Sequence, residues 1–237
     1  MQTIFITGIG TGIGKTLIAA IVTEALGATY WKPVQAGFED GTDTAWVGDR
    51  ISRPEGRLLP EAYKLAMPAS PHIAAREEGI VISLDKIVDQ YETIRNSATD
   101  RPHDRNSTTG SPAGSDAGAP PLVIEGAGGL FVPLNDREFV LDLVRRLDAA
   151  VILVSRNYLG SINHSLLTAA ACRVHGLRVA GWIFNDQYGQ YEHEIVQWSG
   201  LPSIASIPFT DHPDKAFVQA QAAIVRPALL HALGLPG

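Results

Sequence analysis

Residues 8–16, which read Gly-Ile-Gly-Thr-Gly-Ile-Gly-Lys-Thr, are the part of the sequence best suited to bind phosphate. They connect an apolar run, residues 3–7, to a segment of helical period, residues 15–26. Glycines permit positive φ angles, so several backbone N–H groups can point into one concavity, and the following helix N-terminus adds partial positive charge. Lys15 could reach the β- and γ-phosphates, and the Thr16 hydroxyl could bind Mg²⁺. The segment predicts a nucleoside triphosphate site, and a plain glycine-rich turn is the alternative.

This loop is longer than the commonest phosphate-loop pattern, G-x-x-x-x-G-K-[ST]. Five residues separate Gly8 from Gly14, one more than that pattern has. The spacing therefore argues against a generic GTPase or kinase and favours a particular branch of phosphate-loop proteins. Residues 8–13 also do not fit the dinucleotide fingerprint G-x-G-x-x-G.

Two more charged residues follow apolar runs that predict strands. Glu125 ends the run 122–125, and Lys32 follows Thr-Tyr-Trp. Because the carboxyl ends of parallel strands form the ligand crevice of an open α/β sheet, Glu125 could hold Mg²⁺ there and the Lys32 ammonium would face the same crevice. The alternatives are a turn-capping glutamate and a solvated surface lysine. Asp43, at a predicted helix start, is by itself most simply an N-cap or first-turn acid.

The elements that must position these residues alternate between strands and helices. Several strand candidates are apolar on both faces, as in residues 151–154, which is typical of a parallel sheet covered by helices on both sides. We therefore expect a doubly wound α/β fold with a mainly parallel sheet. The predicted strands are residues 3–7, 29–34, 122–125, 150–155, 179–185 and 203–207. The predicted helices are residues 15–26, 42–52, 71–78, 83–96, 138–147, 161–175, 191–198 and 215–233.

Composition narrows the functional classes. The 237 residues are 45% hydrophobic and 19% charged, with a net charge of −6, so no basic field would attract nucleic acid or anionic lipid. The sole cysteine, Cys172, cannot form an intramolecular disulfide, which excludes a stapled secreted scaffold. No signal-peptide pattern and no apolar run long enough to span a membrane is visible. We expect a cytoplasmic protein without nucleic-acid or membrane partners.

One segment departs from the strand and helix pattern. Residues 98–120 contain no large aliphatic or aromatic side chain, so they cannot bury enough apolar surface to offset the entropy of ordering. We expect a single domain over residues 1–237, with a disordered loop insertion at 98–120.

Several blocks of the sequence together resemble the dethiobiotin synthetase family. The blocks are residues 8–16, Trp31-Lys-Pro-Val34, Ser70-Pro-His72, Val123-Ile-Glu-Gly-Ala-Gly-Gly129, Leu159-Gly-Ser-Ile-Asn-His164 and Gly181-Trp-Ile-Phe-Asn185. The resemblance runs from Thr3 to about Phe209 and is interrupted by the polar insertion. It implies a P-loop NTPase fold and a cytoplasmic homodimer. The implied reaction closes the ring of 7,8-diaminopelargonic acid with CO₂ and ATP, through a carbamate and a carbamic–phosphoric anhydride, to give dethiobiotin in biotin biosynthesis.

The resemblance also implies roles for individual residues, with Mg²⁺ as the cofactor and ATP as a co-substrate. Lys15, Lys32 and Thr11 would be catalytic, the two lysines neutralising the carbamate and the transferring phosphoryl group. Thr16, Asp43 and Glu125 would hold the metal. The ATP-binding residues would be Gly12, Ile13, Gly14, Lys15, Thr16, Asn185 (on the adenine) and Pro208 (through nearby backbone). Besides Lys32, the substrate would contact Gly160, Ser161, Ile162 and Asn163, a turn that would bind its carboxylate from the other subunit.

Two other functions share the glycine loop. An ATP-dependent carboxylate-activating ligase with a glutamine-hydrolysing domain would need a cysteine nucleophile, but Cys172 lies in a predicted apolar helix. A positioning or partitioning ATPase switch usually carries an extra lysine inside the loop, and residues 9–13 contain none.

The dethiobiotin synthetase family often has a hydroxyl residue soon after Lys-Pro-Val. Residues 35–37 read Gln-Ala-Gly, so the residue that supplies this contact is open.

Overall fold

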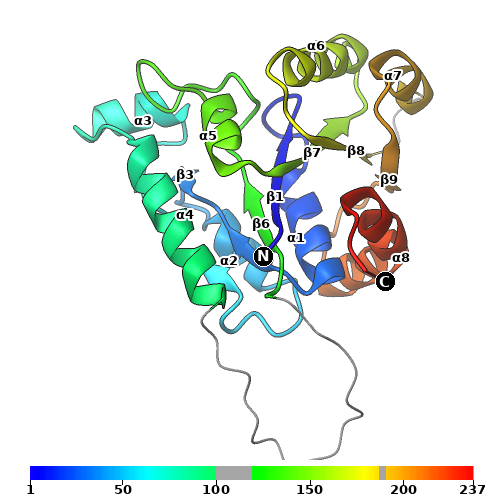
Figure 1. Ribbon diagram of the computed structural model, residues 1–237, viewed down its shortest axis with the longest axis horizontal. Helices are drawn as coiled ribbons and strands as arrows, with labels where there is room; N and C mark the ends of the chain where they lie inside the picture. The colour runs from blue at the N-terminus through cyan, green and yellow to red at the C-terminus, as the bar shows by residue number, and fades with distance from the viewer. Residues whose placement is uncertain (100–118, 187–190, 237) are drawn as a thin grey trace, which may run out of the picture.

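Strand β1 (Thr3–Gly8) lies in the middle of a seven-stranded sheet with the strand order β4-β2-β6-β1-β7-β8-β9. The computed structural model describes residues 1–99, 119–186 and 191–236. The described strand pairs of this sheet are all parallel. The predicted α/β fold with a mainly parallel sheet is therefore confirmed (Figure 1). The other strands are β2 (Thr29–Trp31), β4 (Leu58–Leu59), β6 (Leu122–Glu125), β7 (Ala150–Arg156), β8 (Val179–Asn185) and β9 (Ser203–Ile207).

Helices cover both faces of the sheet (Figure 1). They are α1 (Lys15–Leu26), α2 (Asp43–Gly48), α3 (Pro71–Glu77), α4 (Leu84–Thr99), α5 (Val140–Leu147), α6 (Ser161–Val174), α7 (Tyr191–Ser199) and α8 (Lys215–Leu233). Side chains alternate between the faces along each strand. Ile4 and Ile6 belong to a core cluster with α1 and α8, whereas Phe5 belongs to a second cluster with α4 to α7. Burial on both faces explains the continuous apolar runs.

The carboxyl ends of the central strands meet along one edge of the sheet. β1 runs there into the glycine-rich loop, β6 ends at Glu125 and β8 ends at Asn185. Lys32 follows β2 at the same edge, because β2 is parallel to β6 and beside it. The fold therefore gathers residues that are far apart in the sequence.

The predicted strand 29–34 is wrong as one element. β2 ends at Trp31, and Val34–Ala36 forms a separate strand, β3, that pairs with β5 (Tyr63–Leu65) in a two-stranded sheet. Pro33 explains the break, because it has no N–H to continue a ladder. Its carbonyl instead accepts bonds from the N–H groups of Ala62 and Tyr63.

Other boundaries differ mainly where elements are short. Strands β4 and β5 were not predicted, since two- and three-residue strands carry little periodicity. Helix α2 ends at Gly48, before the predicted residue 52, and α4 continues to Thr99, beyond the predicted residue 96. Residues 100–118, which make up most of the expected insertion 98–120, lie outside the described residues. The single domain with this insertion stays a prediction.

Helix α8 is the one described helix that is long and apolar enough, by length and composition, to cross a membrane. In the fold it packs against α1, with Val218, Ala222, Val225 and Leu229 buried. Its first turn is capped by Asp214, whose carboxylate accepts a 2.8 Å bond from the backbone N–H of Phe217. These four residues are the buried face of a helix whose apolar window is 22% buried in the fold.

Candidate active site

The glycine-rich loop is shaped by left-handed glycines at its end. Gly12 has φ = 71° and Gly14 has φ = 90°, a conformation that side chains with a Cβ rarely adopt. The next residue, Lys15, begins α1, and its ammonium donates a 2.6 Å bond back to the carbonyl of Gly10. The Lys15 ammonium is therefore held against the backbone of the loop, and the residue is 7% exposed. Burial lowers the pKa of Lys15 to about 8, against the attraction of Glu125, which raises it.

The end of β8 is tied to this loop. The Asn185 amide donates a 3.0 Å bond to the carbonyl of Ile13. A Cβ at Gly14 would lie 2.0 Å from the same amide nitrogen, so only glycine fits between the loop and Asn185. Asn185 pairs with Ile207 at the end of β9, and Pro208 follows directly. The structure thus brings Asn185 and the backbone around Pro208 to one place beside the loop.

Four predicted site residues converge beside Lys15. The Thr16 hydroxyl lies 2.9 Å from Glu125 Oε1 and 3.2 Å from Asp43 Oδ1. The Lys32 ammonium donates to Glu125 Oε1 at 2.9 Å and also to Asp43 Oδ2. These side chains come from α1, the turn after β2, the start of α2 and the end of β6. The interpretation of Lys32 as a solvated surface residue is therefore wrong, because its side chain is 7% exposed.

The two carboxylates keep Lys32 charged. Burial alone would lower the pKa of Lys32, but Glu125 and Asp43 together raise it above its ordinary value. An ammonium thus lies between oxygens of two acids and beside a hydroxyl oxygen. Such hard oxygen donors are what Mg²⁺ binds, usually with one or two carboxylates, waters and substrate phosphates.

The donor set is too small for a metal site made by protein alone. Within the described ranges, no group of three or more His, Cys, Asp or Glu side chains could hold a metal ion. A cation at Thr16, Asp43 and Glu125 would therefore need phosphate oxygens or water as further ligands. Asp43 also starts α2, where Thr42 is the N-cap, so the first-turn position expected for Asp43 is correct as well.

Tyr30 belongs to this site and was missed by the sequence reasoning. Its hydroxyl donates a 2.7 Å bond to Glu125 Oε2, and the residue has no exposed surface. Burial raises the pKa of Tyr30 well above its ordinary value, and the charge of Glu125 adds to this effect. The sequence did carry a signal for Tyr30. Alternate residues of a strand lie on the same face, and Tyr30 is two residues before Lys32 in the predicted strand 29–34.

Lys15, Thr16, Lys32, Asp43 and Glu125 line a cleft of about 780 Å³. The glycine loop and the start of α1 line it, and so do Gln35 and Ser70. The Gln35 side chain accepts a 3.2 Å bond from the backbone N–H of Asp43. Ser70 shares a 3.1 Å bond with His72 Nδ1 and is a hydroxyl residue of this cleft near the Gln-Ala-Gly segment.

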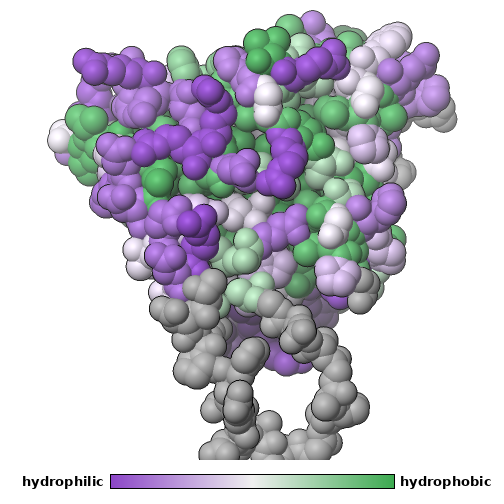
Figure 2. Space-filling model, in the orientation of Figure 1, coloured by the Kyte–Doolittle hydropathy of each residue, from purple (hydrophilic) through white to green (hydrophobic). Residues whose placement is uncertain are grey.

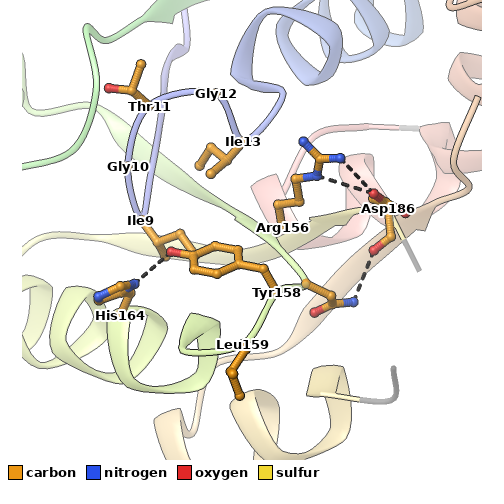
Figure 3. A pocket seen from close by; sticks show the side chains of 11 residues that line it. Ile9, Gly10, Thr11, Gly12, Ile13, Arg156, Tyr158, Leu159, His164 and Asp186 are labelled. Atoms are coloured by element: carbon orange, nitrogen blue, oxygen red, sulfur yellow. Dashed lines mark hydrogen bonds and ion pairs between the residues drawn. The ribbon is translucent and has the colours of Figure 1, made fainter. Parts of the chain in front are cut away.

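A second cavity, of about 670 Å³, lies on the other side of the glycine loop (Figure 3). Arg156 and Asp186 form an ion pair at 3.0 Å on one side of it. The Tyr158 hydroxyl shares a 2.7 Å bond with His164 Nδ1 on the other. Both cavities include Thr11, which is therefore reachable from either side of the loop.

Comparison with known proteins decides the family. A sequence profile of the family described as "AAA domain" matches residues 2–215. A protein of Cytophaga hutchinsonii named ATP-dependent dethiobiotin synthetase BioD is 44% identical over 196 residues, covering 83% of this chain and 82% of that protein. A protein of the same name from a Bradyrhizobium species is 41% identical over 209 residues, covering 88% of each. The chain belongs to the ATP-dependent dethiobiotin synthetase family. Membership confirms the predicted family and makes the chain an ATP-dependent enzyme.

Solved structures extend the fold relationship beyond the synthetase family. The MinD cell division protein of Aquifex aeolicus superposes with a TM-score of 0.54 at 16% identity, covering 100% of this chain and 98% of that chain. A ParA family ATPase from Chlorobium tepidum gives 0.53 at 14% identity, covering 96% of this chain and 91% of that chain. At such identities the likeness concerns the fold alone, and it confirms the predicted P-loop NTPase type.

One group of residues expected from the synthetase family lies apart from the cleft. The turn Gly160–Asn163 starts α6, with Ser161 buried and Asn163 exposed. Among the described residues that line the cleft with Lys32, none comes from this turn. Its neighbours Leu159 and His164 line the second cavity instead.

Proposed function

We propose that the chain catalyses the ATP-dependent ring-closing carboxylation of 7,8-diaminopelargonic acid with CO₂, which gives dethiobiotin, ADP and phosphate in biotin biosynthesis. The observation that carries this proposal is the convergence of two buried lysines, Lys15 and Lys32, on one cleft beside a glycine-rich loop. A carbamate and a triphosphate are both anions, and a cleft that holds them together needs cationic groups on both sides.

The first step forms a carbamate. One neutral amine of the substrate attacks the carbon of CO₂, a C–N bond forms while one C–O π pair moves onto oxygen, and the amine proton passes to solvent. The Lys32 ammonium would neutralise the resulting carbamate anion. Its raised pKa supports this role, because the group remains a cation at the pH at which the amine is free to react.

The second step transfers the γ-phosphoryl group. A carbamate oxygen attacks the γ-phosphorus of ATP, the bond to the β-phosphate oxygen breaks, and ADP leaves from a carbamic–phosphoric anhydride. Phosphoryl transfer depends mainly on positioning and on stabilisation of spread negative charge. Lys15 would supply this charge, with Thr11 beside it, and the backbone N–H groups of Gly12, Ile13 and Gly14 would hold the phosphates.

The third step closes the ring. The second amine attacks the carbonyl carbon of the anhydride, a second C–N bond forms, and the C–O bond to phosphate breaks. The attacking amine loses a proton and inorganic phosphate leaves. No protein nucleophile is required by this sequence of steps, so the residues of the cleft need only hold the anhydride and the amine together.

The oxygen donors of the cleft fit a divalent cation. Thr16, Asp43 and Glu125 would hold Mg²⁺, which when bound supplies positive charge to the phosphate oxygens. With these carboxylates neutralised, the Lys32 ammonium would be available to the carbamate. Asn185 would contact the adenine, with the backbone near Pro208 assisting, since both lie beside the loop.

We further infer a homodimer in which the turn Gly160–Asn163 of one subunit binds the substrate carboxylate in the cleft of the other. The turn is at a helix N-terminus, which suits an anion, yet it does not line the described part of its own cleft. Large apolar side chains lie exposed on α6 and next to it: Leu159 is 90% exposed, Leu167 61% and Val174 80%. The face seen in Figure 2 carries hydrophobic residues in small groups among hydrophilic ones.

The remaining proposals concern location and partners. We infer that the dimer is cytoplasmic, that its ligands are the small molecules above, and that it has no nucleic-acid or membrane partner. The net charge of −6 supports the lack of nucleic-acid binding.

ADP release tests the reaction. With purified protein, Mg²⁺ and ATP, we expect ADP release only when both the diamine and bicarbonate are present. With ¹⁸O-labelled CO₂, one labelled oxygen should appear in the inorganic phosphate, because a carbamate oxygen attacks the phosphorus. ADP release that does not depend on the diamine would contradict the proposal and would favour an ATPase switch or another ligase.

A further inference from the structure

The buried carboxylate of Glu125 has its two oxygens engaged on opposite sides. Oε1 faces the cleft, where the Thr16 hydroxyl and the Lys32 ammonium each lie 2.9 Å away. Oε2 accepts the 2.7 Å bond from the Tyr30 hydroxyl. Glu125 is 1% exposed and Tyr30 is fully buried. The carboxylate therefore cannot exchange its tyrosine partner for bulk water without a rearrangement of the core.

The sheet fixes the position of the Tyr30 hydroxyl. Tyr30 is the central residue of β2, paired with Leu58 on one side and with Val123 on the other. Its ring belongs to the core cluster that includes Ile18 of α1 and Val47 of α2. Tyr30 itself does not line the cleft as the structure describes it. It therefore acts on the site only through Glu125.

Holding Oε2 limits what Glu125 can offer to a cation. Mg²⁺ demands near-octahedral geometry and suits single carboxylate oxygens, whereas Ca²⁺ accepts more ligands and often takes both oxygens of one carboxylate. We infer that Tyr30 is a positioning residue that restricts Glu125 to a single metal-facing oxygen, Oε1, and thereby selects Mg²⁺ over Ca²⁺. This inference rests on the proposed metal site at Thr16, Asp43 and Glu125.

The test is a cation competition that does not depend on turnover. Mn²⁺ bound to the enzyme–ADP complex is followed by electron paramagnetic resonance and displaced with Mg²⁺ or with Ca²⁺. In Tyr30→Phe the ratio of Mg²⁺ affinity to Ca²⁺ affinity should fall about tenfold from the wild-type ratio, because Glu125 is free to turn both oxygens to the ion. The affinities of ADP itself for the two ions are the same in every variant, so they cancel from the comparison.

Tyr91 provides a matched control. It is 4% exposed, and its hydroxyl shares a 2.8 Å bond with Thr3 between α4 and β1. Tyr91→Phe thus removes one buried tyrosine hydroxyl bond outside the cleft, and the ion ratio should stay within about twofold of wild type. Replacement of Tyr30 by 4-aminophenylalanine keeps a donor at the ring position and should restore the wild-type ratio.

The outcomes separate this inference from the proposed metal site. If Glu125→Gln leaves Mn²⁺ binding unchanged, the metal site itself is wrong. If Glu125→Gln weakens Mn²⁺ binding while Tyr30→Phe keeps the wild-type ion ratio, the metal site stands and the role of Tyr30 is wrong. If the ratio of Mg²⁺ affinity to Ca²⁺ affinity falls as far in Tyr91→Phe as in Tyr30→Phe, the role of Tyr30 is also wrong.

A crystal structure of the wild type with Mg²⁺ and ADP decides the case in which Tyr30→Phe does not fold. We expect Oε1 alone on the ion and Oε2 still on Tyr30. Coordination through both oxygens of Glu125 would overturn the inference.

Discussion

The ammonium of Lys32 stays charged although its side chain is almost fully buried, because Glu125 and Asp43 both accept bonds from it. In the proposed reaction a cation would take over the two acids, and the Lys32 ammonium would turn to the carbamate beside them. An ammonium that is already placed in the site loses little entropy when the carbamate binds, so its contribution can go into the transition state.

Lys32→Ala tests this residue. We expect turnover to fall by about 100-fold or more, because an oriented cation is lost from the transition state. The two acids left behind repel each other, so the melting temperature should also fall, although the chain should still fold. ADP release and thermal unfolding measure the two effects. Lys86→Ala, at an exposed position on α4, is the control and should behave as wild type. Turnover retained in Lys32→Ala would remove this lysine from the mechanism.

The lowered pKa of Lys15 predicts that nucleotide binding depends on pH. Burial lowers its pKa to about 8 in the free protein, so the ammonium is present below pH 8 and is lost as the pH rises. The charged form is the one that attracts a triphosphate, so the dissociation constant of ATP should rise above pH 8, approaching about tenfold per pH unit. In Lys15→Arg, whose guanidinium does not titrate in this range, the pH dependence should disappear. An ATP dissociation constant that is flat from pH 7 to pH 10 would contradict this assignment.

The roles of these residues differ in how far the sequence could predict them. Gly14, Lys15 and Thr16 are contiguous, so their spacing alone indicates a phosphate site. Asp43 follows a loop after β3, and no periodicity relates it to Thr16, so only the family resemblance could pair them. Tyr30 was not predicted as a site residue because it lies in an apolar run, which suggests packing in the core. Its hydrogen bond to Glu125 depends on the register between β2 and β6, which cannot be read from the sequence.

At the scale of elements, the site is a set of strand ends and helix starts. The loop between β1 and α1 is held from the side by Asn185 at the end of β8. The Lys32-Pro33 turn redirects the chain from the main sheet into β3, which leaves the Lys32 side chain at the sheet edge. The position of each site residue thus depends on where its helix or strand begins or ends. These boundaries are the least predictable part of the secondary structure.

Gly14→Ala tests the contact between two elements. At φ = 90° an alanine is strained, and its Cβ would lie 2.0 Å from the Asn185 amide nitrogen, so the Asn185 side chain must separate from the loop and lose its bond to Ile13. We expect ATP affinity to fall by about tenfold or more, and the melting temperature to fall as well, because backbone strain of about 1–3 kcal/mol destabilises the folded chain. Gly10→Ala is the matched control in the same loop, because no atom lies within 4 Å of the position of its Cβ. Equal ATP affinity in Gly14→Ala and wild type would show that the loop tolerates the separation.

At the scale of the whole molecule, the fold was the most predictable feature. Runs such as residues 151–154 are apolar on both faces because helices cover both sides of a parallel sheet, and that pattern is visible without a structure. The short strands β4 and β5 escaped prediction because they are defined by their pairing partners. The same fold occurs in the MinD and ParA proteins at low identity, so the blocks at the sheet edge, not the fold, distinguish the function.

The proposed dimer predicts a change of mass and activity together. A charge on the exposed face of α6, as in Leu167→Glu, should leave the chain monomeric where the wild type is expected to be dimeric, because an isolated charge cannot be buried in an apolar interface. Light scattering after size-exclusion chromatography measures the mass. The variant should still bind ATP but should lose turnover, since the carboxylate-binding turn then comes from no partner.

The control for this variant lies elsewhere on the surface. Ile224 on α8 is 69% exposed, close to the 61% of Leu167, so Ile224→Glu adds the same charge at a similar exposure. It should remain dimeric and active. A wild-type chain that is active as a monomer would contradict the proposed shared site.

A crystal structure with a non-hydrolysable ATP analogue, Mg²⁺, the diamine and bicarbonate is the most direct test of the site. We predict the γ-phosphate within hydrogen-bond distance of Lys15, the metal bound by Thr16, Asp43 and Glu125, and the Lys32 ammonium on the carbamate oxygen. A triphosphate bound away from the glycine-rich loop, or a Lys32 ammonium turned out of the cleft into solvent, would contradict the account.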